Sequence, residues 1–116
     1  MAVTQNTSIN LVVDQVADFS KNLTVTTDGS TAYDISGLTF NGQVRPSYDS
    51  STLTATFTIS IVTAASGIYK LQLADTVTKD ISSGRYVYDV MMTLADSTIE
   101  VVHKGILTVN PRVTQL

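Results

Sequence analysis

The feature that most restricts the fold is a strict alternation of apolar and polar residues from Leu53 to Ile61. Each residue between two apolar positions is a threonine or a serine. A period of two is typical of a strand with one buried face and excludes an α-helix. We therefore predict one continuous strand with five inward-facing residues: Leu53, Ala55, Phe57, Ile59 and Ile61.

A second alternation follows a polar turn that contains Gly84. One face of it carries Tyr86, Tyr88, Val90, Met92 and Leu94, which we expect to meet a second sheet. The strands expected along the chain, separated by turn signals, are 8–13, 19–26, 38–45, 53–61, 68–73, 86–94 and 98–109. About seven short strands with regular turns indicate a β-sandwich.

Composition supports this class. The chain is rich in Thr, Ser, Val and Ile, which fit a pleated, half-buried surface. It contains no cysteine, and its 116 residues suffice for one hydrophobic core. The prediction is an all-β fold, an immunoglobulin-like antiparallel β-sandwich without a disulfide, in a single domain over residues 1–116.

Several positions carry finer predictions. Gly42 takes an inward slot, which indicates a bulge or a close backbone approach, and Gly105 indicates a bulge in the last strand. The connection at 33–37 is expected to be anchored by Tyr33 and Ile35. The crossing at 74–81 is expected to contain at most one helical turn, with Val77 and Ile81 as its anchors.

Residues 82–88 (Ser-Ser-Gly-Arg-Tyr-Val-Tyr) resemble the tyrosine corner of immunoglobulin-like domains. The resemblance implies that the Tyr86 hydroxyl bonds upstream backbone. Tyr88 stands where those domains have a cysteine, and the chain has no tryptophan. The likeness is therefore to the architecture rather than to antibody domains.

The residues offer little for catalysis or metal binding. His103 is the only histidine and Glu100 the only glutamate; a zinc site or a Ser-His-Asp arrangement needs more partners. We expect His103 to be exposed or at the rim of a strand. We predict no catalytic, cofactor-binding or metal-binding residues and no cofactor. Four aspartates could share a Ca²⁺ between loops, although turn and cap roles explain them better: Asp14, Asp18, Asp28 and Asp34.

Charge and hydropathy restrict the partners. The formal net charge is −3 and the pI is about 4.7, which disfavours nucleic acid because phosphate binding needs clustered Lys and Arg. The longest apolar runs, at 11–13 and 90–92, are too short for a membrane span. The first residues show neither the basic nor the apolar part of a secretory signal.

The stretch 53–61 also has a meaning for assembly. It contains no Lys or Pro to prevent pairing with another chain. If it lies at a sheet edge, it is a candidate assembly surface, and we expect the domain to work in an oligomer. Its threonine array, Thr52 to Thr58, is better explained by outward β-propensity than by ice binding.

Six segments carry a wider resemblance: Phe19-x-x-x-Leu-Thr-Val, Asp28-Gly-Ser, Tyr33-Asp-Ile-Ser-Gly-Leu-Thr-Phe, Gln43-Val-Arg, Gly84-Arg-Tyr-Val-Tyr-Asp-Val and Gly105-Ile-Leu-Thr-Val-x-Pro-x-Val-Thr. From Phe19 to Thr114 the chain resembles small virion proteins of tailed bacteriophages. It is similar to the N-terminal domain of phage baseplate upper proteins and to sandwich modules of tail, fibre and capsid-associated proteins.

The resemblance implies a non-enzymatic structural protein of a phage particle. Its expected place is the virion, assembled in the host cytoplasm, as a tail, baseplate or fibre-anchoring adaptor; the alternative is a capsid decoration protein. The expected partners are other virion proteins and copies of itself, not nucleic acid or membrane. A carbohydrate-binding sandwich is a third possibility, which would need exposed aromatic side chains; Tyr48, and less surely Tyr33, lies in a loop.

Overall fold

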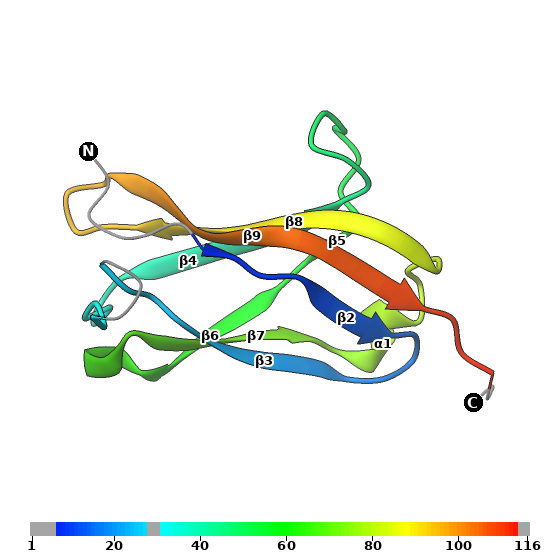
Figure 1. Ribbon diagram of the computed structural model, residues 1–116, viewed down its shortest axis with the longest axis horizontal. Helices are drawn as coiled ribbons and strands as arrows, with labels where there is room; N and C mark the ends of the chain where they lie inside the picture. Colours follow the sequence, from blue (N-terminus) through cyan, green and yellow to red (C-terminus); the bar gives the residue numbers. More distant parts are fainter. Residues whose placement is uncertain (1–6, 28–30, 114–116) are drawn as a thin grey trace.

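Two facing β-sheets make up the computed structural model, which describes residues 7–27 and 31–113 (Figure 1). The large sheet contains β1 (Thr7–Ser8), β2 (Leu11–Asp14), β4 (Thr39–Arg45), β5 (Ala55–Thr56), β8 (Gly84–Thr93) and β9 (Ile99–Asn110). The small sheet contains β3 (Phe19–Thr24), β6 (Thr58–Thr63) and β7 (Ile68–Leu73). Two short helical turns connect strands: η1 (Ala64–Ser66) and α1 (Asp75–Thr78).

The strand order confirms the predicted all-β sandwich. The large sheet runs β1-β9-β8-β4-β5, with β2 also paired to β9, and the small sheet runs β3-β7-β6. The neighbours β4, β8 and β9 correspond to the C, F and G strands of an immunoglobulin-like sandwich, and β3, β7 and β6 to its B, E and D strands. Among the strands of the described residues, the antiparallel expectation fails only for β1 and β2, which pair with β9 in parallel.

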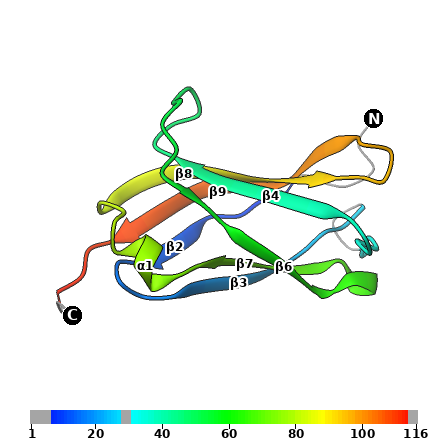
Figure 2. The same ribbon diagram turned by 180° about the vertical axis from the view of Figure 1, so that it is seen from behind.

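The stretch 53–61 is not the single strand that its alternation predicted. The chain pairs with β4 as β5, crosses at Phe57, and pairs with β7 as β6 (Figure 2). Phe57 links the sheets, because its ring is buried and its N–H donates to the Gly42 carbonyl at 2.9 Å. Leu53 and Ile61, predicted to be inward, are 46% and 39% exposed, since each lies near an open edge.

Aromatic rings fill the space between the sheets. Phe40 stacks on Tyr69 with centroids 4.7 Å apart, and Phe57 meets Tyr88 edge-on at 5.8 Å. The predicted inward face of β8 is confirmed: Tyr88, Val90 and Met92 are buried, and Tyr86 and Leu94 are half-buried.

The tyrosine corner is present. The Tyr86 hydroxyl donates to the carbonyl of Ser82, 2.7 Å away, at the start of β8. This bond ties the strand to the polar turn before it, as the resemblance implied.

The glycine predictions have different outcomes. A Cβ on Gly42 would lie 2.9 Å from Cδ2 of Phe57, which confirms the close approach. Gly105 is in register with Tyr88, so no bulge lies there; the register shift falls at Val102 instead. Gly105 is needed for another reason, because a Cβ would lie 2.2 Å from the Ile9 carbonyl oxygen.

The connections follow the sequence in part. Ile35 is fully buried and Tyr33 is half-buried, as predicted. The crossing between the sheets contains the single turn α1, and Ile81 is buried behind it. Val77 was the wrong anchor, since it is 37% exposed; Thr78 is buried instead and donates its hydroxyl to the Ala17 carbonyl at 2.9 Å. A polar side chain with a backbone partner therefore fills this position.

Candidate assembly surfaces

The outer edge of β6 is the most open strand edge of the sandwich. β6 is the last strand of the small sheet and has the sequence Thr-Ile-Ser-Ile-Val-Thr, without any charge or proline. Five of its six residues are exposed, including Ile61 and Val62, at 39% and 48%. The sequence made 53–61 a candidate assembly surface if it lies at a sheet edge, and its uncharged β6 part does lie at one.

The three other edges are interrupted or guarded. On the small sheet, β3 carries Lys21 on the same face as the buried Leu23, and an inward-pointing charge at an edge discourages pairing. On the large sheet, β5 is only two residues long. The β1–β2 edge is broken between its two short strands, where Asn10 accepts a bond from the Ile106 N–H at 3.2 Å.

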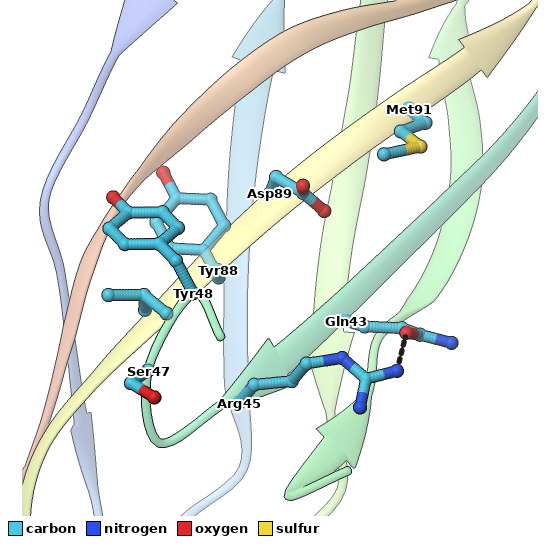
Figure 3. A pocket seen from close by; sticks show the side chains of 8 residues that line it. Gln43, Arg45, Ser47, Tyr48, Tyr88, Asp89 and Met91 are labelled. Atoms are coloured by element: carbon cyan, nitrogen blue, oxygen red, sulfur yellow. Dashed lines mark hydrogen bonds between the residues drawn. The ribbon is translucent and has the colours of Figure 1, made fainter. Parts of the chain in front are cut away.

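A second surface is a hollow of about 190 Å³ on the outer face of the large sheet (Figure 3). Its floor is formed by β4 and β8, and its wall by the loop after β4, which carries Tyr48. The Arg45 guanidinium fixes this loop, because it donates to the Ser51 carbonyl at 3.0 Å and to the side-chain oxygen of Gln43 at 2.9 Å. Tyr48 is 72% exposed, so its ring is available to a partner.

Asp89 lies on the floor of this hollow, between Tyr48 and Met91. Partial burial raises the pKa of its carboxyl above the usual value, and the charge of Arg45 opposes that shift. A carboxylate that has lost part of its hydration attracts cationic groups. The hollow therefore combines an aromatic ring, a thioether and one charge of each sign, from Asp89 and Arg45.

His103 is not at the rim, contrary to the prediction. It is 2% exposed and lies between the sheets, with its ring centroid 5.5 Å from that of Tyr69. The cause is the register shift in β9, which turns both Val102 and His103 into the core. The sequence marks this position only weakly, because the shift comes at no glycine or proline.

The buried imidazole has two partners on the small sheet. Its Nδ1 is 2.5 Å from the Tyr69 hydroxyl, and the ring is also hydrogen-bonded to the backbone of Thr24. Burial raises the pKa of Tyr69 far above its usual range, so its hydroxyl keeps its proton and donates to Nδ1. Burial lowers the pKa of His103 to about 4, and the bond to Thr24 opposes this shift. A neutral imidazole thus links the two sheets.

Two of the aspartates considered for Ca²⁺, Asp34 and Asp18, have turn and cap roles. Asp34 accepts bonds from the N–H and hydroxyl of Ser36, which also lowers the pKa of its carboxyl. Asp18 accepts the N–H of Asp75 at the start of α1, and Asp14 accepts a bond from the Asn110 side chain. Asp28 lies outside the described residues. Within residues 7–27 and 31–113, no group of three or more potential metal ligands occurs.

Sequence reasoning found the edge but missed the hollow. Its lining comes from alternate outward residues of β4 and β8, which look like ordinary solvent-facing positions. Only their cross-strand register, which pairs Gln43 with Asp89, brings them together.

In the part of the chain that the structure describes, no helix is long and apolar enough to cross a membrane.

Comparison with known proteins gives no assignment: no protein-family model matches the chain, and no curated protein matches it significantly.

Proposed function

We propose that the protein is a non-enzymatic structural component of a tailed-bacteriophage particle that works through protein–protein contacts. The open, uncharged edge of β6 carries the proposal, because such an edge offers backbone groups to another chain. Resemblance to phage virion sandwiches supports the location. Within the virion, the proposed role is a tail or baseplate adaptor or a fibre-anchoring module, with other virion proteins as partners.

Two surfaces suit such a role. In a symmetric assembly, every copy forms the same modest contact through its open strand edge. The hollow beside Tyr48 lies on the other sheet, so a single copy has surfaces on two sides for two neighbours. A module that joins neighbours in this way needs no catalytic residue.

Quantitative mass spectrometry of purified particles tests the proposal. In the phage that encodes this chain, we expect about six to a few dozen copies per particle, as tail symmetry requires. Hundreds of copies would instead identify a capsid decoration protein. The controls are a known tail protein and a non-structural enzyme of the same phage. If the chain, like that enzyme, is absent from the particles, the proposal is wrong.

A second candidate function, glycan binding, is favoured by the exposed ring of Tyr48 beside a hollow with the polar groups of Gln43 and Asp89. A glycan array tests it: binding by the wild type that Tyr48→Ala abolishes would support it. An array without hits would remove it and leave the structural role intact.

A further inference from the structure

We propose that the β6 edges of two copies pair antiparallel about a two-fold axis, so that their small sheets join into one continuous sheet. The inference rests on the proposed function and names the partner of the open edge as a second copy of the chain. Four observations carry it: the direction of the free backbone groups, their register, the side chains beside them and the absence of charge.

One hydrogen bond fixes which backbone groups of β6 are free. The Val25 N–H donates to the Gly67 carbonyl at 2.8 Å, and this pair continues the β3–β7 ladder, in which Thr24 faces Ile68. In an antiparallel ladder, successive residues direct both backbone groups alternately to one neighbour and to the other. The Gly67 carbonyl and the backbone groups of Tyr69 are therefore directed to β3, whereas those of Ile68 and Lys70 are directed to β6.

The same alternation applies to β6 from Thr58 to Ile61, because the register with β7 shifts only after Ile61. Ser60 faces Lys70, so its backbone groups point to β7, and those of Ile59 and Ile61 point outward. Phe57, two residues before Ile59, agrees with this direction, because its N–H bonds the large sheet at Gly42 rather than β7. Among the described residues, no backbone hydrogen bond reaches the outward groups of Ile59 or Ile61.

A single register uses all of these groups. If Ile59 of one copy faces Ile61 of the other, the two-fold axis passes beside Ser60 and four hydrogen bonds form, two at each Ile59–Ile61 pair. The contact is isologous, as a closed dimer requires. The two Ser60 residues then face each other as a non-hydrogen-bonded pair, with Cα atoms about 4.5 Å apart.

The side chains favour the same arrangement. Ile59 and Ile61 lie on the core face of the small sheet, because their partners on β7, Leu71 and Tyr69, are buried. Pairing would place isoleucine against isoleucine and cover Ile61, which is 39% exposed in the single copy. The apolar layer would thus continue from one copy into the next.

The lack of charge on β6 points to a second copy rather than to a charged peptide. No Lys, Arg, Asp or Glu lies on the strand to select a partner of opposite sign. The opposite edge of the same sheet shows the contrast, since β3 carries Lys21 and the backbone of Thr24 is bonded to His103. One edge of the small sheet is thus protected and the other is left open.

Single-cysteine variants test the pairing directly, because the chain has no cysteine of its own. Ser60→Cys should form a covalent dimer under mild oxidation, since the Cα separation suits a disulfide. Thr58→Cys is the matched control on the same strand: in this register its two copies lie four residues, about 13 Å, apart. Ser20→Cys, exposed on the guarded β3 edge, is the second control.

The expected result is rapid cross-linking of Ser60→Cys and slow, equal cross-linking of both controls. Equal rates for all three variants would indicate random collision and overturn the proposal. Preferential cross-linking of Thr58→Cys would overturn it as well, because it requires another register.

A second variant measures the contact without a cross-link. Ile61→Lys places a charge on the β6 edge, as Lys21 does on β3, and such a charge discourages strand pairing. The position is exposed enough for the ammonium group to reach water. Sedimentation velocity should show a concentration-dependent dimer for the wild type and a monomer for Ile61→Lys, with unchanged circular dichroism. A wild type that stays monomeric, or an Ile61→Lys variant that dimerises equally well, would overturn the proposal.

The proposed β6 dimer and the proposed structural role can be disproved independently of each other. A monomeric protein that is found in purified particles would disprove the β6 dimer and keep the structural role. A β6 dimer that is absent from particles would disprove the role and keep the dimer.

Discussion

His103 shows how one buried polar residue can set the properties of this sandwich. Its imidazole stays neutral between Tyr69 and Thr24, so the two sheets are joined by hydrogen bonds as well as by apolar contacts. A protonated imidazole could no longer accept the Tyr69 hydroxyl at Nδ1. The sequence could not reveal this, because a lone histidine between Val102 and Lys104 looks the same inside or outside until the register of β9 is known.

Stability should therefore fall as the pH falls. Burial lowers the pKa of His103 in the folded state to about 4, against the ordinary value of 6.5 for a histidine in water. Between these values the unfolded chain binds a proton that the folded chain does not, so unfolding becomes easier toward pH 4, by about 3 kcal/mol in total. Urea unfolding at pH 4 to 7.5 measures this change. His103→Gln should lack it; equal pH slopes for the two proteins would contradict the account.

Removing the Tyr69 hydroxyl, which faces His103, should lower the free energy of unfolding more than removing the partly exposed hydroxyl of Tyr86. Tyr69→Phe leaves Nδ1 unpaired in the core, which costs about 1–3 kcal/mol. Tyr86→Phe removes the bond to the Ser82 carbonyl at the surface, where water can replace it, and costs about 0.5–1.5 kcal/mol. Urea midpoints at pH 7 compare the two. A larger loss for Tyr86→Phe would show that the buried bond does not matter.

At the scale of elements, the sequence predicted which side chains face inward better than which strands pair. Alternation identified the inward face of β8, because a period of two needs only local geometry. It gave no sign that one alternating stretch, 53–61, serves both sheets. That division depends on Phe57, whose bond to Gly42 joins segments that alternation alone does not relate.

The parallel strands β1 and β2 depend on a close approach to Gly105. A Cβ there would lie 2.2 Å from the Ile9 carbonyl oxygen, and backbone cannot move aside as a side chain can. Gly105→Ala should therefore destabilise the fold by about 3 kcal/mol, at the upper end of the range for overpacking. Lys104→Ala, at the exposed neighbouring position, should change it by less than about 0.5 kcal/mol. Urea unfolding at pH 7 compares both variants with the wild type; equal midpoints for Gly105→Ala and Lys104→Ala would contradict this packing.

For the whole molecule, the sequence predicted the fold class and one of the two candidate surfaces. The all-β class followed from composition and alternation, and the candidate edge from the absence of Lys and Pro in 53–61. The hollow beside Tyr48 could not be predicted, because its lining depends on the register of β4 with β8. The direction of the free groups on β6 likewise depends on the ladder between β3 and β7.

Residue-resolved amide hydrogen exchange at two protein concentrations tests the open β6 edge most directly. In dilute solution, the Ser60 amide should exchange slowly and the amides of Ile59 and Ile61 quickly, since only the first is bonded to β7. At high concentration, Ile59 and Ile61 should become protected while the exposed loop around Tyr48 does not change. Fast exchange at Ile59 and Ile61 at every concentration would contradict the account.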